Sequence, residues 1–325
     1  LNDHEYGDSI LNLDSEYGYK FRAYDSYDHL GFSVASSNDV DGDGLPDLVM
    51  GAPGFAADYG AVYIVSSSTI WMNTLFGFTN DLWMGDSYDY RITSDTWGHF
   101  GYSIDSSGDF DGDGINDLLV GQHGNSEMAT NGGAAYLFSG GALNWGDNDL
   151  SDAAFKFVYN GDSLDYDEIG YSVSFAGDVD GDGLSDILIG APYDDDWANN
   201  AGKAYLALGK SLVAPGSEFD LAFADYTFVC ADDSCEAGRS VSGAGDIDQD
   251  GLDDIIIGAP LNDINGTNDG SAYVIFGEQL AARGGDLNLD QSDWVVLGQE
   301  DHDLLGGTIA SAGDVDGDGL EDLLI

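Results

Sequence analysis

The sequence predicts an all-β chain, a β-propeller of four-stranded antiparallel blades. One observation is a nine-residue acidic segment that occurs five times. Its copies begin 68 to 70 residues apart, at Asp39, Asp109, Asp178, Asp246 and Asp314. The other is that each period contains four short strand-like runs and almost no helical periodicity. Four strands in a repeat of about 69 residues are typical of a propeller blade. We therefore expect a single propeller domain over residues 1–325, with five repeats visible.

Each acidic segment is expected to join two strands of a hairpin. The segments that precede it alternate apolar and small polar residues, as half-buried strands do, and short apolar runs typical of buried strands follow it. In the second repeat the four strand candidates are Phe100–Ile104, Asp117–Val120, Ala134–Phe138 and Ala154–Tyr159.

All five acidic segments follow the pattern D-x-D-x-D-G-x-x-D, and we call them acidic loops 1 to 5 (residues 39–47, 109–117, 178–186, 246–254 and 314–322). Carboxylates at positions 1, 3, 5 and 9 and a backbone carbonyl at position 7 offer the oxygen ligands that Ca²⁺ prefers, and the Gly at position 6 permits the sharp turn. The sequence thus predicts about five Ca²⁺ ions per chain. Because each loop supplies its own carboxylates, we expect the five sites to be independent.

The predicted ligands occupy the same five positions in every loop. They are Asp39, Asp41, Asp43, Leu45 and Asp47; Asp109, Asp111, Asp113, Ile115 and Asp117; Asp178, Asp180, Asp182, Leu184 and Asp186; Asp246, Asp248, Asp250, Leu252 and Asp254; and Asp314, Asp316, Asp318, Leu320 and Asp322.

Two other interpretations of the loops are weaker. An EF-hand needs a Glu at position 12 and flanking helices, whereas position 12 is apolar in every copy: Met50, Val120, Ile189, Ile257 and Ile325. Asp-Gly clusters also form ordinary turns. Five copies with all four aspartates intact favour a metal site over a simple turn.

The repeat resembles the FG-GAP repeat, which builds the β-propeller of integrin α subunits and of many secreted bacterial proteins. The resemblance rests on Phe100-Gly101, on the acidic loops, and on the Gly-Ala-Pro tripeptides that start at Gly51, Gly190 and Gly258. It covers essentially the whole chain and implies calcium on one face of the propeller. The departures are Leu30-Gly31, Ile169-Gly170, Ala237-Gly238, Gly306-Gly307 and Gly121-Gln122-His123, and none of them is a predicted ligand.

The chain ends suggest a fragment of a longer ring. Tyr19–Tyr24 is expected to be the fourth strand of an earlier unit, and Ile325 falls within a second strand. A natural end there would leave backbone groups unpaired. Segment Gly258–Phe276 of the fourth repeat has no counterpart in the fifth, which therefore lacks its third strand. Its equivalent would complete five units, and a seven-bladed ring would need two further repeats.

Composition restricts the partners of this chain. Sixty-one Asp and Glu residues against eight Lys and Arg give a formal charge of −53, which disfavours nucleic acid and anionic membranes. The sequence contains no apolar run of 18 residues or more, which a membrane-spanning helix needs, so we expect no direct membrane insertion. A hydrophobic content of 43% argues against a disordered acidic chain.

Cys230 and Cys235 are the only cysteines. They lie between a fourth strand and the next first strand, where a disulfide could close the loop, and the alternative is two free thiols. A disulfide would indicate an extracytoplasmic compartment. We therefore expect an extracellular location, secreted or on the cell surface.

The face opposite the acidic loops is the candidate partner surface. In an antiparallel blade the connections between strands 2 and 3 and between successive blades share that face, and here they carry Trp97, His99, Tyr193 and Trp197. Aromatic residues on loops above a rigid scaffold are typical of recognition surfaces. Solvated loops without a partner are the alternative.

The sequence contains no recognisable catalytic motif. His29, His99, His123 and His302 are expected on the candidate partner face, where a cluster could bind a transition metal or act as a base, but scattered surface histidines explain them better. The sequence therefore predicts a non-enzymatic adhesion or recognition module for protein or glycan. One alternative is a self-assembling subunit of a surface layer or extracellular filament, and another is a propeller domain of a secreted polysaccharide- or lipid-degrading enzyme.

Overall fold

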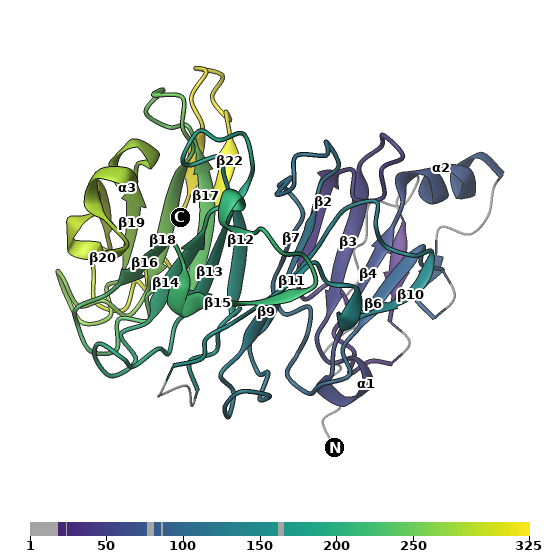
Figure 1. Cartoon of the computed structure of the whole chain (residues 1–325), viewed down its shortest axis with the longest axis horizontal. Helices are drawn as coiled ribbons and strands as arrows, with labels where there is room; N and C mark the ends of the chain where they lie inside the picture. Colours follow the sequence, from purple (N-terminus) through teal and green to yellow (C-terminus); the bar gives the residue numbers. More distant parts are fainter. Residues whose placement is uncertain (1–18, 24, 77–80, 86, 162–165) are drawn as a thin grey trace.

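Small antiparallel sheets set side by side form the molecule (Figure 1). The computed structural model describes residues 19–23, 25–76, 81–85, 87–161 and 166–325. Four sheets each contain four consecutive antiparallel strands. These are β2 (Val34–Asn38), β3 (Asp47–Ala52), β4 (Ala61–Val65) and β6 (Tyr90–Thr93); β7 (Ile104–Asp105), β8 (Leu118–Gln122), β9 (Ala134–Phe138) and β11 (Phe155–Val158); β12 (Ser172–Gly177), β13 (Asp186–Ala191), β14 (Lys203–Ala207) and β16 (Tyr226–Val229); and β17 (Ser240–Gly245), β18 (Asp254–Ala259), β19 (Ser271–Ile275) and β21 (Trp294–Leu297). The prediction of an all-β fold with four-stranded antiparallel blades is confirmed.

Two-stranded sheets flank these four blades. At one end β1 (Lys20–Arg22) lies within the expected strand Tyr19–Tyr24, of which residue 24 is outside the described residues, and at the other end β22 (Ala310–Gly313) pairs with β23 (Asp322–Leu324). Within the described ranges no strand pairing joins the first sheet to the last.

One of the strand candidates is largely wrong. In place of Phe100–Ile104, only β7 is a strand, and Phe100 forms an isolated parallel bridge with Gly60 of the preceding blade. The cause is Gly101, whose φ of 85° turns the chain between the bridge and β7.

Four sheets gain a parallel strand that the sequence pattern did not predict. It comes from the connection between strands 3 and 4 of the following repeat and pairs with the fourth strand of the blade before it: β5 (Asp81–Trp83) with β1, β10 (Gly146–Asp149) with β6, β15 (Ser217–Asp220) with β11, and β20 (Asp286–Asn288) with β16. These segments are short and rich in Asp, so they lack the apolar alternation that identifies a strand. Each one ties two successive repeats together at the outer edge.

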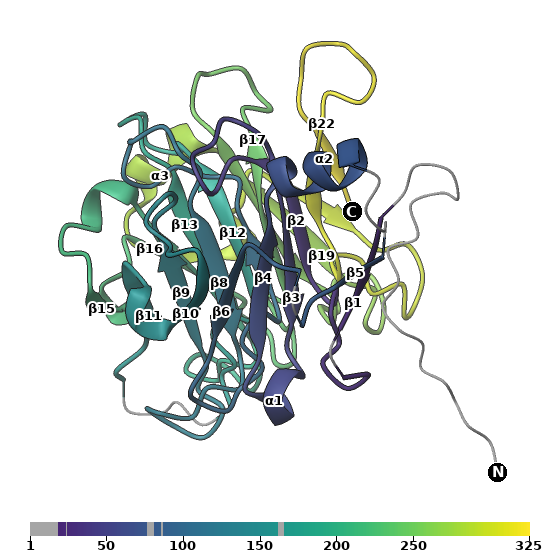
Figure 2. The ribbon, with the colours of Figure 1, turned by 90° about the vertical axis from the view of Figure 1, so that its right-hand side faces the viewer.

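Short helices occur in the same 3–4 connections, and α1 (Phe55–Asp58) lies in the 2–3 connection of the first full blade. The others are α2 (Ser67–Phe76), α3 (Gly277–Arg283) and the 3₁₀ turns η1 (Leu150–Asp152), η2 (Gly209–Ser211), η3 (Leu221–Phe223) and η4 (Leu289–Gln291). In two views at right angles, α1 lies at one end of the strands and α2 at the other (Figures 1 and 2). The 2–3 and 3–4 connections therefore lie on opposite faces, as the antiparallel order requires.

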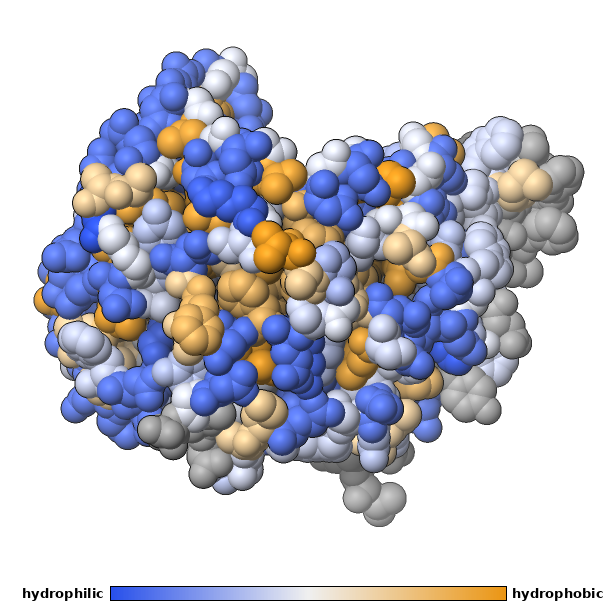
Figure 3. All heavy atoms as spheres, viewed as in Figure 1, coloured by the Kyte–Doolittle hydropathy of each residue, from blue (hydrophilic) through white to orange (hydrophobic). Residues whose placement is uncertain are grey.

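The core lies between adjacent sheets. Strands β8 and β9 are buried along their whole length, because neighbouring blades cover both of their faces. Each of the four full blades places a buried tyrosine in its third strand: Tyr63, Tyr136, Tyr205 and Tyr273. The visible surface is mostly hydrophilic, with apolar residues scattered over it (Figure 3).

Backbone contacts between adjacent blades explain the repeated glycines. A Cβ added at Gly190 would lie 2.0 Å from the Gly238 carbonyl oxygen of the next blade, so only glycine fits there. The Ser172 hydroxyl donates to the same carbonyl at 2.8 Å, while the Gly238 N–H donates within its own blade to the Gly258 carbonyl at 3.0 Å. Gly51, Gly121 and Gly258 approach the next blade in the same way. We call these contacts the blade seam.

The close contacts at the blade seam predict that one added methyl group lowers the stability of the fold. Gly190→Ala should lower the free energy of unfolding by about 2–3 kcal/mol, because the new Cβ overlaps backbone atoms that cannot move independently. Gly307→Ala is the matched control, since its Cβ would meet no atom closer than 3.2 Å. Denaturant unfolding of both variants checks the prediction, and equal stabilities would contradict it.

Candidate metal loops and the opposite aromatic face

The five acidic loops gather carboxylate oxygens at one end of the blades. In each loop three aspartates each contribute one carboxylate oxygen, and these three oxygens lie within 4.8 Å of one another. In loops 1 and 4 these are the residues at positions 1, 3 and 5, and in loops 2, 3 and 5 they are at positions 1, 3 and 9. Oxygen donors at this separation suit a hard divalent cation.

Backbone N–H groups orient these carboxylates. In loop 3 the Asp178 carboxylate accepts from Gly181, Asp182 and Gly183 N–H at 2.8–2.9 Å. Asp182 N–H also donates to Asp180 Oδ1, and Leu184 N–H donates to Asp182 Oδ1. These bonds use Oδ1 of Asp180 and of Asp182, so the Oδ2 atoms are left for contact with a positive charge. The other loops repeat most of these bonds.

The aspartate at position 9 also has a structural role. Asp186 is fully buried, and its two oxygens accept from Val179 N–H at 2.9 Å and from Gly209 N–H at 2.8 Å. It therefore ties the acidic loop to the end of the third strand. Asp117 and Asp254 bind the equivalent groups.

Burial disfavours the charged form of these position-9 carboxyl groups. It raises the pKa of Asp117 and Asp186 to about 7 and that of Asp47 and Asp254 to about 6. A nearby cation would oppose this effect by favouring the carboxylate.

A side-chain cation already contacts one of the loops. The Lys210 ammonium pairs with Asp180 Oδ2 in loop 3, while the lysine side chain stays half exposed. The ammonium therefore lies at a position that favours positive charge. Because its side chain is half exposed, it can move into solvent when another cation binds. Donor type, orientation and this stand-in charge all fit a divalent cation.

The opposite face carries a row of side chains, one from each of four successive blades. Phe32, Tyr102, Tyr171 and Arg239 each follow a repeated glycine, namely Gly31, Gly101, Gly170 and Gly238. The rings of Phe32 and Tyr102 are 4.7 Å apart, those of Tyr102 and Tyr171 are 5.0 Å apart, and the Arg239 guanidinium lies 4.9 Å from the centre of Tyr171. Sequence reasoning missed this row, although recurrence after the repeated glycine could have revealed it.

Several predicted partner residues join this row. The His123 ring lies 4.2 Å from Tyr102 and stacks on His99 at 5.3 Å, and His99 contacts the half-exposed Trp97 at 5.3 Å. Tyr193 is 6.3 Å from Tyr171, and its hydroxyl accepts from Arg239. We call Phe32, Trp97, His99, Tyr102, His123, Tyr171, Tyr193 and Arg239 the aromatic row. Trp197 is exposed and makes no ring contact with it in the described part of the chain.

The histidines in this row have defined partners. His123 Nδ1 lies 3.0 Å from Glu168 Oε2. Burial, followed by the neighbouring His123, lowers the pKa of His99. In the part of the chain that the structure describes, no histidine belongs to a group of three potential metal ligands within 4.8 Å. The row therefore presents aromatic faces and a guanidinium rather than a metal site.

Equivalent loops of two blades are held together by different interactions. In the fourth repeat Cys230 and Cys235 form a disulfide, and Asn262 Nδ2 lies 3.1 Å from Cys235 Sγ. In the third repeat Asp167 occupies the position of Cys235, and Asp194 that of Asn262.

A buried ion network surrounds that third-repeat position. Lys203 Nζ lies 2.8 Å from Asp194 Oδ2 and 3.1 Å from Asp196 Oδ2. Asp167 is buried nearby, and its Oδ1 has no hydrogen-bond partner. Burial, together with the Asp194 and Asp196 carboxylates, raises the pKa of Asp167 to about 8.

Blades with a buried tyrosine, a glycine seam and an acidic hairpin loop define a class of repeat β-propellers. The family model for the FG-GAP repeat matches residues 30–65, 100–138, 169–206 and 237–275. The chain belongs to this FG-GAP repeat family. Loop 5 lies outside the four matched segments.

The chain is also similar to integrin α subunits. It is 28% identical to integrin alpha pat-2 of Caenorhabditis elegans over 317 residues, 92% of this chain and 22% of the relative. It is 28% identical to integrin alpha-V of Gallus gallus over 238 residues (72% and 20%) and 31% identical to integrin alpha-5 of Xenopus laevis over 163 residues (50% and 14%). The matches span about a fifth or less of these relatives. Among the described residues, no helix has the length and apolar character that a bilayer crossing requires.

The pKa of Asp167 predicts a pH dependence of stability. Between about pH 4, where an unfolded aspartate titrates, and the folded value of about 8, the native state retains a proton that the unfolded state has lost. This stabilising contribution is complete below pH 4 and is lost as the pH rises through 8. Asp167→Asn should therefore gain stability relative to the parent protein as the pH rises from 5 to 8.5.

Urea unfolding at both pH values, with calcium held constant, measures this difference. Ser126→Ala, an exchange at an exposed loop position on the same face, is the control for a substitution that removes a hydrogen bond but no titrating group. A stability difference between Asp167→Asn and the parent that does not change with pH would contradict the assignment.

Proposed function

We propose that this chain is a calcium-stabilised β-propeller domain that acts outside the cell as an adhesion or recognition module. Residues 1–325 form one such domain, with about five Ca²⁺ ions in the acidic loops and a protein or glycan partner on the aromatic row. Similarity to integrin α subunits supports an adhesion module at the level of the family. The observation that carries the proposal is the separation of the acidic loops and the aromatic row onto opposite faces.

The acidic loops support the calcium assignment by their charge. A loop holds four aspartates, and mutual repulsion at these distances destabilises the folded hairpin unless a cation offsets it. Asp39, Asp109, Asp178, Asp246 and Asp314 would hold the ion together with the residues at positions 3, 5 and 9 and the carbonyl at position 7. Lys and Arg are too few in this chain to supply that charge.

The aromatic row supports a macromolecular partner. Trp, Tyr and Arg dominate binding energy at interfaces, and the aromatic rings bury much surface with little loss of side-chain entropy. Trp97 and Phe32 are about half exposed while their neighbours hold them in place. The sequence also lacks a nucleophile–base motif, and for these reasons we infer binding without catalysis.

The disulfide between Cys230 and Cys235 supports an extracellular location, since such bonds persist in oxidising compartments.

Removal of calcium should lower the thermal midpoint markedly. A ligand that binds only the folded state stabilises it by about 2.7 kcal/mol per site at a hundredfold excess over its dissociation constant, and several loops contribute. Calorimetric melting in excess chelator, followed by restoration with Ca²⁺, measures the effect. Mg²⁺ at the same concentration is the control, because Mg²⁺ demands tighter octahedral geometry. An unchanged midpoint in chelator would refute the calcium assignment.

Substitution of two exposed tryptophans should weaken partner binding. Trp97→Ala with Trp197→Ala removes exposed rings from the candidate partner face, so binding to glycan arrays, to candidate proteins or to itself should fall at least tenfold while calcium content stays the same. Trp71→Ala is the matched control, because Trp71 is equally exposed but lies on α2 at the other face.

Sedimentation and electron microscopy of the same three proteins separate a foreign partner from self-association. Calcium-dependent polymers that the double variant fails to form would favour the structural subunit. Turnover of a polysaccharide or lipid by this chain would overturn the non-enzymatic assignment.

A further inference from the structure

Neighbouring acidic loops are bonded directly to one another. The backbone N–H at position 8 of one loop donates to the backbone carbonyl at position 1 of the loop before it. The three bonds are Asn116 N–H to Asp39 O at 2.9 Å, Ser185 N–H to Asp109 O at 2.9 Å and Asp253 N–H to Asp178 O at 3.1 Å. Position 1 carries a predicted ligand, and position 8 lies between two others. The bonds therefore join the ligand segments of adjacent loops.

Side chains reinforce two of these connections. Asp109 N–H donates to Ser185 Oγ at 3.0 Å, and Asp178 N–H donates to Asp253 Oδ2 at 2.7 Å, so the position-1 residue is held on both sides of its Cα. Position 7 of each following loop also packs on the glycine at position 4, where an added Cβ would lie 3.0 Å from the side chain: Ile115 on Gly42, Leu184 on Gly112 and Leu252 on Gly181.

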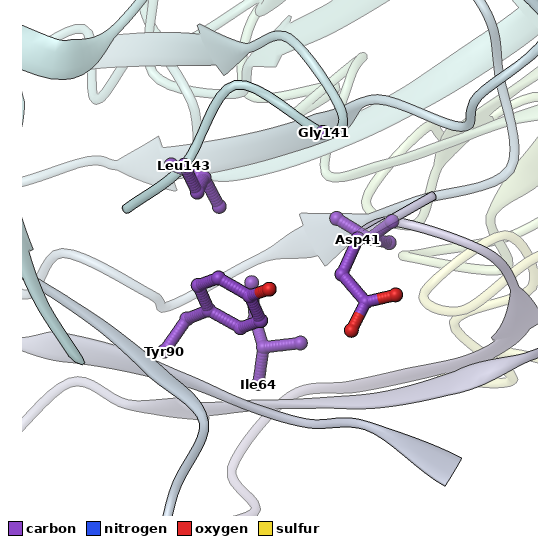
Figure 4. A pocket seen from close by; sticks show the side chains of 6 residues that line it. Asp41, Ile64, Tyr90, Gly141 and Leu143 are labelled. Carbon is purple, nitrogen blue, oxygen red and sulfur yellow. The ribbon is translucent and has the colours of Figure 1, made fainter. Parts of the chain in front are cut away.

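Further parts of the second blade also hold loop 1. Gly141 N–H donates to the Val40 carbonyl at 2.8 Å. Asp41, Ile64 and Tyr90 of the first blade face Gly141 and Leu143 of the second across a small cavity (Figure 4). The position-3 ligand of loop 1 therefore borders a neighbouring blade, and its surroundings depend on how that blade is ordered.

The series ends at the fourth loop. In the described chain no bond joins the position-8 residue Glu321 to the Asp246 carbonyl, and the packing of Gly245 against Glu321 is the contact in its place. Loops 1 to 4 thus form a bonded series, and loop 5 lies outside it.

We infer that loops 1 to 4 bind calcium cooperatively and that loop 5 binds it independently of them. This inference rests on the proposed calcium function and replaces the expectation of five independent sites. A loop that closes on a cation fixes its position-1 backbone, which in turn fixes residues 7 to 9 of the next loop. That loop then loses less conformational entropy when it binds, and this gives positive cooperativity.

Electrostatics act in the opposite direction. Neutralisation of one loop reduces the negative potential that attracts a cation to the next. This effect is screened over about 8 Å at 0.15 M salt, whereas coupling through backbone bonds is not screened. The cooperativity of loops 1 to 4 should therefore persist or strengthen as the ionic strength rises.

Hydrogen exchange of peptides from each loop, followed during titration with Ca²⁺ alone, resolves the five sites. Asp182→Asn disables loop 3 and should raise the calcium midpoints of loops 2 and 4 about fivefold or more, the lower range of typical coupling. Asp318→Asn, the same exchange in loop 5, is the matched control and should leave the midpoint of loop 4 unchanged.

A second variant removes one bond without removing a ligand. Ser185→Pro deletes the N–H that donates to Asp109, and Pro46 at the equivalent position of loop 1 shows that this repeat accommodates proline there. The variant should raise the midpoint of loop 2 and leave that of loop 5 unchanged. Ser185→Ala removes only the hydroxyl and should have a smaller effect.

The outcomes separate the two proposals. Protection of every loop by calcium, with unchanged midpoints at loops 2 and 4 in Asp182→Asn and at loop 2 in Ser185→Pro, would overturn the coupling and leave the calcium sites intact. If calcium protected no loop in the parent protein, the calcium function and the coupling would both be wrong.

Discussion

The packing of the blades is limited by the close approach of backbones at the blade seam. The carbonyl of Gly238 takes the space that a side chain at Gly190 would need and accepts a hydrogen bond from Ser172. Neighbouring blades therefore pack backbone against backbone, and this distance brings successive acidic loops, and successive side chains of the aromatic row, into contact. A larger residue at the seam would disturb both faces.

Carboxylates have two distinct roles in this acidic chain. Those at positions 1, 3 and 5 of the loops are partly or fully exposed and are oriented by backbone N–H groups. The position-9 residues of loops 1 to 4 are buried and link the loop to the end of the third strand. The Asp at position 9 is a predicted ligand that also accepts two backbone hydrogen bonds, one from its own loop and one from a residue just after the third strand, as Asp186 does from Val179 and Gly209. The same residue type thus forms a candidate ion site and a permanent part of the fold.

The repeats keep their geometry while they change the chemistry of their contacts. Cys230 and Cys235 close one connection covalently, and Asp167, Asp194 and Lys203 close the equivalent connection with a buried ion network. A disulfide holds its loop at any pH, but the ion network changes its energy as Asp167 titrates.

The sequence by itself determined the blade architecture and the acidic loops. Both depend on residues that are close in the chain: the Asp and Gly positions of a nine-residue segment, and the apolar runs of strands such as β8 and β13. Periodicity and local spacing report such features directly. The sequence also placed Trp97, His99 and Tyr193 on the face opposite the loops, because strand order fixes that.

Tertiary structure alone decided what joins one repeat to the next. The parallel strand β10, the aromatic row through Tyr102 and Tyr171, and the bond from Ser185 to Asp109 all pair residues more than 50 positions apart. Each depends on blade packing rather than on local propensity, and β10 is too polar and too short to be recognised as a strand. Local pattern can predict a blade, but the contacts between blades form only when the blades are packed together.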